Sequence, residues 1–364
     1  MVHVLFSVAN WGLGHATRDV PLIRECLARG CEVSLASSGA ALTFLKQEFP
    51  SCTHFHLKDK TMKYSASNSQ VAFVFRILYD LPRYALSFEK EHKELEALHK
   101  EHAFDLVISD GRYGSYLDAV PSYIISHQLH FSIPHPFEKF EIGAEIFNLY
   151  SFDSFEKIIV PDNHPTVGSL AGKLSQPKLK TLKKKLVYAG ILCSIDHQPV
   201  AEDIDYLLSV SGPEPRRTEL ERIVLDQVTQ LPGKKVVALG KPHKQEQYAL
   251  DEQTYVYSHL NRQDMESHLN RAACVVTRSG YTTMMELANI RKRRALFIPT
   301  PGLTEQEYLA SYYEEQHWFH AVKQDELDLA GDVQACTNYS GFPSMPDAQE
   351  NARKLVDNVL SGTL

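Results

Sequence analysis

Glycine turns that follow apolar runs carry the side chains of this chain that are best suited to chemistry. The first turn, residues 11–18 (WGLGHATR), follows the apolar run 2–9 and precedes a helical pattern. Gly14 and the other glycine of the turn allow a tight entry into the helix, whose free amides favour anions and polar ligands. An imidazole ionises near neutral pH, so His15 could act as a general base. The alternative interpretation is that His15 only caps the helix.

A dinucleotide site is the first function to weigh, because a GxG sequence after the first strand opens the fingerprint of such sites. The fingerprint fails at two positions. Thr17 stands where the third glycine belongs, and the second strand ends in residues 37–39 (SSG) without the acid that binds a ribose. We therefore expect neither NAD nor FAD, and no other cofactor.

Two further turns lie in the second half of the chain, at residues 209–217 and 277–283. Each follows a strand pattern and opens a helix, and in a parallel sheet both fall at the same edge, so two helix N-termini can face one anion. A diphosphate fits that geometry, although an isolated Ser-Gly before a helix is more often only a cap. The candidate residues of these turns are Gly212, Arg216, Arg278, Ser279 and Gly280.

Polar residues downstream of these turns extend the candidate site. Glu286 lies about two helical turns after Ser279 and could accept hydrogen bonds from both hydroxyls of a ribose. The next strand leads into residues 299–308, where Thr304 and Glu307 have the spacing of a capping box. Gln306 and Glu307 also fall on the same side of the sheet, where sugar hydroxyls would find donors and acceptors.

Short β-rich runs alternate with helical patterns along the chain, which indicates mostly parallel sheets covered by helices. The predicted strands are 2–9, 32–37, 53–57, 104–109, 122–126, 157–160, 186–189, 206–210, 234–239, 254–257, 273–277 and 294–298. Helices are predicted at 16–29, 39–49, 70–101 with a break near Pro82, 139–149 and 346–361.

These elements predict an α/β chain of two Rossmann-like doubly wound parallel-sheet domains that face each other across a cleft. Two domains also suit the length of 364 residues, because a single core stops growing near 250–300 residues. We expect an N-terminal domain at 1–192, a linker at 193–204, a C-terminal domain at 205–345 and a closing helix within 346–364.

Composition excludes several classes of protein. The net charge of −7 lacks the excess of Lys and Arg that nucleic-acid binding needs. The six cysteines are scattered without a CxxC pair, which argues against structural zinc and disulfides. The sequence has neither a signal-peptide pattern nor a run of 18 apolar residues. We expect a cytoplasmic protein whose only membrane contact would be peripheral, at the inner face of the membrane.

Taken together, the motifs resemble the GT-B glycosyltransferases, in particular those of family 28 type near MurG, which adds N-acetylglucosamine to a lipid-linked peptidoglycan precursor. The resemblance covers nearly the whole chain and implies an acceptor-binding N-terminal domain and a nucleotide-sugar-binding C-terminal domain. It is carried by GxGH at 12–15, SDGR at 109–112, SHQ at 126–128, residues 209–216, RSG at 278–280, Glu286 and TEQE at 304–307.

The resemblance implies transfer of a sugar from a nucleotide sugar, such as the UDP-sugar UDP-N-acetylglucosamine, to an acceptor hydroxyl, with inversion and without a metal. The resemblance also implies a donor site that includes Gly14. In that site Glu286 would bind the ribose, Gln306 and Glu307 would bind the sugar, and a loop with His259 and Leu260 would bind the nucleotide base. The residues around the diphosphate would be Gly212, Arg216, Arg278, Ser279 and Gly280. For the catalytic base we favour His15 over Asp110 and His127.

Two departures from the MurG pattern leave the donor open. Residues 212–215 (GPEP) replace a glycine-rich turn, and Gln306 with Glu307 replaces a pair of glutamines. The acceptor, for which a lipid-linked molecule is one candidate, does not follow from the likeness. A nucleotide-sugar hydrolase or epimerase on the same fold, or a non-catalytic nucleotide-sugar-binding protein, are the alternative functions.

Two other patterns have simpler interpretations than the chemistry they suggest. Asp203 and Asp205 have the spacing of a metal-binding DxD motif but fall in the predicted linker, where a charged turn is expected. His127, His130 and His135 lie on an irregular stretch without the i, i+4 spacing of a helical ligand pair. Finally, the lysines at 178–185 are expected to be solvated, with anionic lipid headgroups as the alternative partner.

Overall fold

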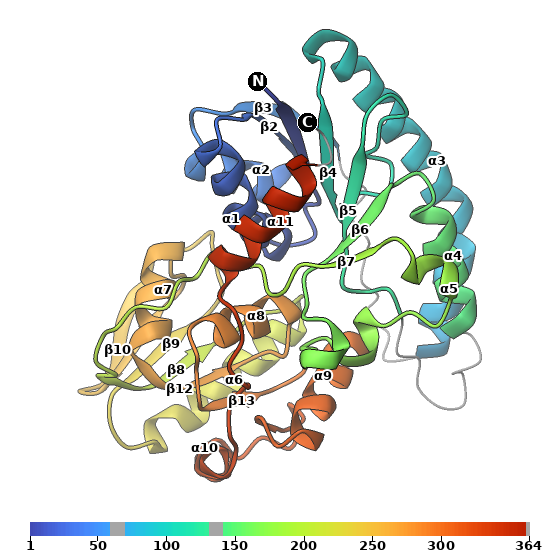
Figure 1. Ribbon diagram of the computed structural model, residues 1–364. Coiled ribbons are helices and arrows are strands. Elements are labelled where there is room, and N and C mark those ends of the chain that lie inside the picture. The colour runs from blue at the N-terminus through green and yellow to red at the C-terminus, as the bar shows by residue number, and fades with distance from the viewer. Residues whose placement is uncertain (59–69, 131–140, 362–364) are drawn as a thin grey trace. The chain divides into compact units, whose positions relative to one another are not determined.

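The computed structural model describes residues 1–58, 70–130 and 141–361, without the side chains of residues 70–85, 144, 360 and 361. The chain divides into two compact units. The first comprises Met1–Ser194 together with Pro346–Leu364, and the second comprises Ile195–Met345. Each unit is an α/β layer structure built on its own sheet (Figure 1).

The sheet of the first unit is entirely parallel, in the order β3-β2-β1-β4-β5-β6-β7. Its central strands are almost completely buried, as expected for apolar runs with helices on both faces. The strands are β1 His3–Val8, β2 Glu32–Ser37, β3 Thr53–His56, β4 Leu106–Asp110, β5 Ser122–Ile125, β6 Lys157–Val160 and β7 Leu186–Tyr188.

The helices of this unit cover both faces of the sheet. They are α1 Gly14–Ala28, α2 Gly39–Glu48, α3 Gln70–His102, α4 Glu141–Ser151, α5 Lys180–Lys183 and α11 Ala348–Ser361. Val4 and Phe6 of β1 point into a core shared with α1, α2 and α11, whereas Leu5 points into a core with α3. Figure 1 shows α11 beside α1 on one side of the sheet, with α3 on the other. The predicted break at Pro82 is wrong, because α3 continues through this residue.

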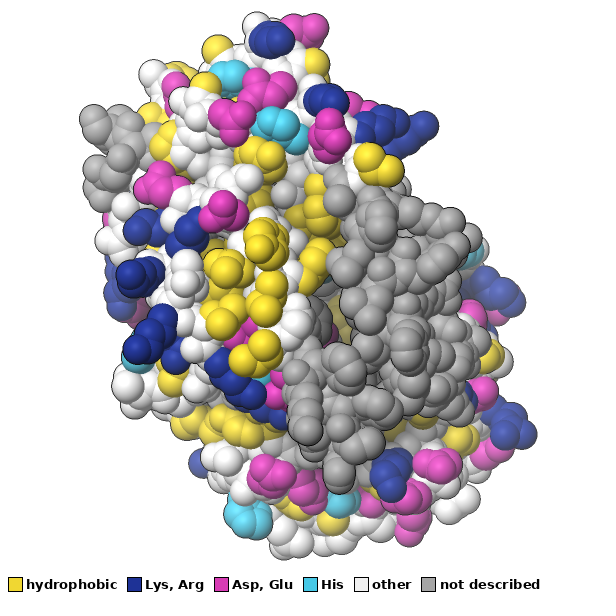
Figure 2. Space-filling model, turned by 90° about the vertical axis from the view of Figure 1, so that its right-hand side faces the viewer, with side chains coloured by type: hydrophobic (Ala, Val, Ile, Leu, Met, Phe, Trp, Pro, Cys, Tyr) yellow, Lys and Arg dark blue, Asp and Glu magenta, His cyan; other side chains and the backbone are white. Residues whose placement is uncertain are grey.

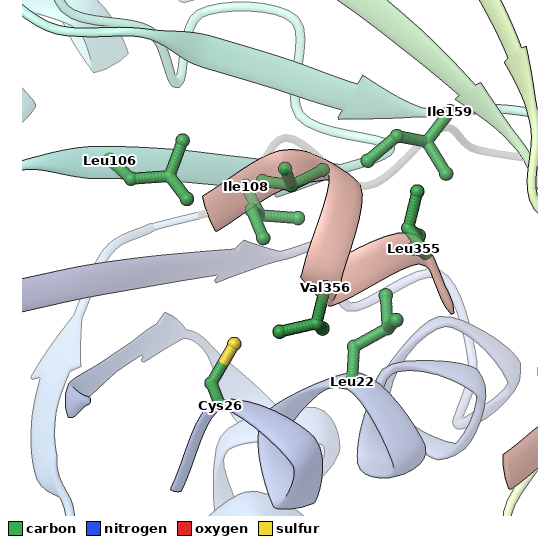
Figure 3. A pocket seen from close by; sticks show the side chains of 8 residues that line it. Leu22, Cys26, Leu106, Ile108, Ile159, Leu355 and Val356 are labelled. Atoms are coloured by element: carbon green, nitrogen blue, oxygen red, sulfur yellow. The ribbon is translucent and has the colours of Figure 1, made fainter. Parts of the chain in front are cut away.

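The C-terminal helix α11 belongs to the first unit, to which the chain returns after completing the second. Ala352, Leu355 and Val356 are buried in the core that α11 shares with α1. Burying one such Leu or Val contributes about 1.5–3 kcal/mol. Figure 3 shows the small apolar pocket that remains between Leu355 and Val356 of α11 and Leu22 and Cys26 of α1. Its lining holds no charged group, so it offers no proton or anion chemistry.

The sheet of the second unit has the order β10-β11-β9-β8-β12-β13-β14, in which only β10 is antiparallel to its neighbour. Its strands are β8 Ile204–Ser209, β9 Lys235–Ala238, β10 Gln247–Asp251, β11 Thr254–Tyr257, β12 Ala272–Thr277, β13 Ala295–Phe297 and β14 His320–Ala321. Its helices are α6 Arg216–Gln227, α7 Arg262–Arg271, α8 Tyr281–Asn289, α9 Thr304–Glu315 and α10 Leu329–Ala335.

Both sheets share the strand order of a doubly wound Rossmann fold. In the first unit β1 lies between β2 and β4, and in the second β8 lies between β9 and β12. At these two places the chain changes the direction in which it adds strands, and such switch points bind ligands at the carboxyl ends of the strands. The α/β fold class predicted from the sequence is confirmed, and the turns after β1, β4, β8 and β12 lie at these two switch points.

Candidate functional site

The switch point of the first unit joins the ends of β1 and β4. Val8 and Asp110, the last residues of these strands, are register partners. After β1 the chain turns through Gly12, which has a φ of 104°, and α1 begins at Gly14. The N-cap residue of α1 is Leu13, so His15 is not a capping residue and its side chain remains available for other contacts.

His15, Arg18 and Asp110 form one compact cluster at this switch point. Nδ1 of His15 lies 2.6 Å from Oδ1 of Asp110, and Nε of Arg18 donates to Oδ2 of Asp110 at 2.5 Å. Arg18 Nη2 also donates to Oδ1 of Asp110, which makes the ion pair bidentate. Asp110 and Arg18 are buried, whereas the His15 side chain is 20% exposed to solvent. The cluster therefore presents an accessible imidazole that is held by a buried ion pair.

The charge state of Asp110 follows from its neighbours. Burial alone would raise the pKa of Asp110, but the adjacent Arg18 and His15 outweigh burial and hold the pKa well below its ordinary value. A carboxylate only accepts hydrogen bonds, so Nδ1 of His15 carries the proton that it donates to Asp110. Nε2 then has a free lone pair, and in the described residues it has no hydrogen-bond partner. This is the tautomer that a general base requires.

A buried network behind Asp110 fixes the turn that follows β4. Ser109 donates to the carbonyl of Arg112 at 2.6 Å, and Arg112 donates through Nε to Glu91 of α3 at 2.5 Å. Gly111 adopts a φ of 69°, and a Cβ at this position would lie 3.0 Å from Cε1 of His15. Glycine is required here both by its backbone conformation and by the close approach of the imidazole.

The structure separates His127 from His130, two of the three histidines that follow β5 in the sequence. His127 comes close to the cluster, since its Nδ1 lies 3.4 Å from Nη1 of Arg18. His130 is buried instead between Glu145, 2.5 Å from its Nδ1, and Glu141, 3.1 Å from its Nε2. His130 is therefore a structural link to α4, and His135 lies outside the described residues.

The switch point of the second unit brings the two predicted anion-binding turns together. Leu208 of β8 is the register partner of Val276 of β12, and the turns that follow these strands meet through Arg278. A Cβ on Gly212 would lie 3.3 Å from the Thr300 hydroxyl and 3.7 Å from Nε of Arg278. The helices α6 and α8 begin at Arg216 and Tyr281, directly after these turns. Because β8 and β12 are neighbouring strands, the N-termini of these two helices lie at the same edge of the sheet.

Arg278 is the centre of this edge. Its five N–H donors meet five acceptors within 3.2 Å, namely the carbonyls of Ser211, Arg216, Ile298 and Pro299 and the side chain of Gln324. Burial lowers the pKa of Arg278 to about 10, with Glu219 acting in the opposite direction and Arg216 in the same one. Arg278 therefore holds the turns in place, and the guanidinium keeps no donor for a ligand. Ser279 is likewise engaged, because its hydroxyl donates to the Gln306 carbonyl at 2.8 Å.

Glu286 lies on α8, five residues after the helix begins. In the described part of the chain its carboxyl has no hydrogen-bond or ion-pair partner, and burial raises its pKa to about 7. The cause is desolvation without a compensating donor. Hydroxyl groups of a ligand would supply such donors.

The residues after β13 differ from the expected capping box. The helix α9 begins at Thr304 itself, with Leu303 as its N-cap and no side-chain cap, because the helix starts one residue earlier than the box requires. Glu307 instead accepts from the Gly302 amide at 2.9 Å, and Gln306 Oε1 accepts from the Thr300 amide at 2.9 Å. Within the described ranges, the side-chain amide nitrogen Nε2 of Gln306 donates no hydrogen bond. This nitrogen would lie 3.9 Å from a Cβ placed on Gly280.

The remaining predicted residues lie at the same edge or away from it. His259 and Leu260 follow β11, with His259 exposed and Leu260 buried. Arg216 starts α6 and donates to Glu219 at 2.8 Å. Asp203 is held by Arg271, whose hydrogen bond lowers the pKa of Asp203, as expected of a charged turn.

Comparisons with known proteins agree with this arrangement. Residues 2–123 match a family model described as glycosyl transferase family 1, and residues 217–359 match one described as glycosyltransferase family 28 C-terminal domain. The chain belongs to the glycosyltransferases of the GT-B fold. The family-28 likeness predicted from the sequence is thereby confirmed.

Individual relatives of this glycosyltransferase are distant. An uncharacterized glycosyltransferase of Methanosarcina acetivorans is 28% identical over 170 residues, which is 44% of this chain and 42% of that protein. MurG of Acinetobacter baumannii has the same fold, with a TM-score of 0.60 at 15% identity, covering 98% of this chain and all of that one. The spinosyn rhamnosyltransferase SpnG complexed with thymidine diphosphate has a TM-score of 0.61 at 13% identity, covering 99% and 96%.

Sequence reasoning missed the roles of Arg18 and Asp19 in this glycosyltransferase. Both follow His15 on α1, at i+3 and i+4, and both are buried. Residues with this spacing share one face of a helix. Two charged residues on the face of a helix that also carries a candidate base were the signal that could have indicated a buried charge network.

Proposed function

We propose that this glycosyltransferase moves a sugar from a nucleotide sugar, specifically a UDP-sugar such as UDP-N-acetylglucosamine, to a hydroxyl of an acceptor. The observation that carries the proposal is His15, whose Nδ1 is engaged by Asp110 and whose Nε2 is open. An imidazole oriented by a buried carboxylate at the carboxyl edge of a parallel sheet is suited to remove a proton from a hydroxyl.

The first unit would activate the acceptor. Nε2 of His15 takes the hydroxyl proton as the acceptor oxygen attacks the anomeric carbon. The imidazolium that forms is stabilised by Asp110, which Arg18 keeps ionised and oriented. A general base of this kind accelerates a reaction by about 10²–10⁴-fold.

The second unit would bind the donor and stabilise the leaving group. Glu286 would accept from the ribose hydroxyls, and Nε2 of Gln306 would donate to the sugar. The diphosphate would sit at Gly212, Ser279 and Gly280, where two helix N-termini favour negative charge. These amides let us propose departure of the nucleotide without a metal. The complex of SpnG, which has the same fold, with thymidine diphosphate supports the proposal that this protein binds a nucleoside diphosphate.

We also propose inversion at the anomeric carbon. A single attack from the side opposite the leaving group inverts the configuration, whereas retention through a covalent intermediate needs an accessible nucleophile. Asp110 is fully buried and both its oxygens accept from Arg18, so it is a poor nucleophile toward a sugar.

For the acceptor we propose a lipid-linked molecule. The exposed surface of α4 would contact the membrane in which this molecule is held. Ile142, Ile146 and Tyr150 of α4 are exposed. Lysines adjoin this helix, because Lys178 contacts Glu141 at its start. Figure 2 shows hydrophobic side chains gathered on this face with Lys and Arg beside them. None of the described helices is long and apolar enough to span a bilayer.

Vesicle sedimentation tests this surface. The protein should sediment with vesicles of anionic lipid and remain in solution with neutral ones, and Ile142→Ser with Ile146→Ser should lower the sedimented fraction. Val167→Ser is the matched control, because Val167 is an exposed apolar residue of the same unit that is not part of α4. Equal sedimentation of all three proteins would refute the surface.

Incubation with UDP-sugars tests the reaction itself. Transfer predicts that UDP appears only when an acceptor is added. UDP release without an acceptor would indicate a hydrolase, interconversion of sugars an epimerase, and tight binding without turnover a sensor. The configuration of the product, read by proton NMR, tests inversion.

A further inference from the structure

Asp19 is a buried ionisable residue beside the His15 cluster that the proposed mechanism does not use. Its side chain is completely buried, and in the described part of the chain neither carboxyl oxygen has a hydrogen-bond partner. A buried carboxyl without a donor is costly and needs an explanation.

The position of Asp19 brings it to Asp110. Asp19 is four residues after His15 on α1 and directly follows Arg18, so it lies on the face that meets the end of β4. Burial raises the pKa of Asp19 well above its ordinary value, the Asp110 carboxylate raises it further, and Arg18 opposes both. These two residues, from β4 and from α1 itself, are the charged groups that act on Asp19.

Charge balance in this cluster leaves no counter-charge for a second anion. The guanidinium of Arg18 forms a bidentate pair with Asp110. An ionised Asp19 would place two carboxylates, which only accept hydrogen bonds, against each other in a dry environment. One proton between them removes the repulsion and turns Asp19 from an acceptor into a donor.

We propose that Asp19 is a neutral carboxylic acid that donates a hydrogen bond to Asp110 and thereby sets how strongly Asp110 supports positive charge on His15. Asp19 is then a positioning residue, and its catalytic meaning rests on the proposed function of His15. Its hydrogen bond withdraws electron density from Asp110, which weakens the attraction of Asp110 for an imidazolium.

Titration of His15 by NMR, on the whole protein without substrate, tests the proposal. Asp19→Asn keeps a donor of the same shape and cannot ionise, so the titration midpoint of His15 should stay within about 0.3 pH unit of wild type. Asp19→Leu keeps the branched shape, with larger end groups, but has no donor. Asp110 then attracts the imidazolium more strongly, and the midpoint should rise by about half a unit or more. In an active enzyme the acidic limb of the pH–rate profile moves with it.

Two outcomes would overturn the proposal. A lower midpoint in Asp19→Asn would mean that this variant has removed a negative charge and that Asp19 is ionised. An unchanged midpoint in a folded Asp19→Leu would mean that Asp19 is only a structural residue. Neither outcome depends on glycosyl transfer, so a protein that titrates as expected but transfers no sugar refutes the proposed function and leaves the role of Asp19 intact.

Unfolding by urea keeps the test decisive where Asp19→Leu does not fold. Folded wild type holds a proton on Asp19 that the unfolded chain releases above about pH 4, so its stability falls as the pH rises from there. Asp19→Asn lacks this contribution, and the stability of the variant relative to wild type should increase from pH 5 to pH 8. Parallel curves for the two proteins would show that Asp19 is ionised when folded.

Discussion

Oδ1 of Asp110 lies 2.6 Å from Nδ1 of His15, although the two residues are 95 positions apart in the chain. Asp110 ends β4, and His15 stands in the first turn of the helix that follows β1, the neighbouring strand. Parallel pairing of β1 with β4 creates this contact, which fixes the tautomer that leaves Nε2 open.

His15→Gln removes the base and keeps a polar side chain of similar reach. Transfer should fall by about 10²–10⁴-fold, the contribution expected of a general base. Affinity for UDP, measured by calorimetry, should change by less than twofold, because the donor is proposed to bind the second unit. Transfer within a few-fold of wild type would remove His15 from the mechanism.

Gly111→Ala tests the placement of the imidazole. The new Cβ would lie 3.0 Å from Cε1 of His15, so the ring must move, and kcat should fall at least tenfold. Gly30→Ala is the matched control, since Gly30 has a φ of 75° against 69° for Gly111 and no atom within 4 Å of the new Cβ. Both variants should lose about 1 kcal/mol of stability from backbone strain. Equal loss of kcat in the two would show that strain, and not the position of His15, matters.

Asp110→Asn removes the charge that pairs with buried Arg18. The unpaired guanidinium should cost about 3–5 kcal/mol of unfolding free energy at pH 7. Because Arg18 and His15 outweigh burial and hold the pKa of Asp110 below its ordinary value of 3.8, its ionisation stabilises the folded state above about pH 4. The advantage of wild type should therefore shrink as the pH falls below 4. Urea unfolding at pH 7 and pH 3 measures it, and a gap that does not narrow would contradict the assignment.

The sequence predicted most of the fold because local patterns decide it. The run of residues 3–8 alternates between two buried faces, and the turn at Gly12 ends it, so strand and turn can be recognised without long-range information. The short edge strands β10 and β14 were missed. The residues of β10 are all exposed and carry no apolar pattern, and β14 spans only two residues.

The candidate site was less predictable, because its contacts join distant strand ends. Arg278 was expected at the diphosphate as a free cation. Its five partners come from the ends of β8 and β13, from the start of α6 and from Gln324, which no spacing in the sequence indicates. Likewise, the Glu286 carboxyl has no partner in the described ranges because of how distant segments pack around it, which the sequence pattern does not indicate.

Glu286→Gln should raise the stability of the folded protein and lower its affinity for UDP. Burial raises the pKa of Glu286 to about 7 from an ordinary 4.5, so the folded state holds a proton that the unfolded chain releases, and wild type loses stability as the pH rises from 4.5 to 7. The variant lacks this loss and should be more stable than wild type at pH 8, by up to about 3 kcal/mol. The difference should vanish below pH 4.5. If the stability advantage of the variant over wild type were no larger at pH 8 than at pH 4, burial would not perturb this carboxyl.

Binding by the same variant tests the ribose contact. Loss of a charged acceptor should weaken UDP about tenfold or more, since a hydrogen bond to a charged group contributes about 1.5–3 kcal/mol. Uridine diphosphate without the 2′ and 3′ hydroxyls is the control ligand, and its affinity should be equal in wild type and variant. Equal weakening of both ligands would place Glu286 away from the ribose.

Arg278→Lys should disrupt the second switch point although it keeps the charge. Lysine offers three donors from a single atom and cannot meet five acceptors spread over three turns. At least two buried acceptors lose their partners, at about 1–3 kcal/mol each, so the urea midpoint and the affinity for UDP should both fall. Arg271→Lys is the control, because Arg271 forms a half-exposed ion pair with Asp203, and such a pair is worth at most about 1 kcal/mol. If Arg278→Lys bound UDP as tightly as Arg271→Lys does, the turns would not depend on this guanidinium for their shape.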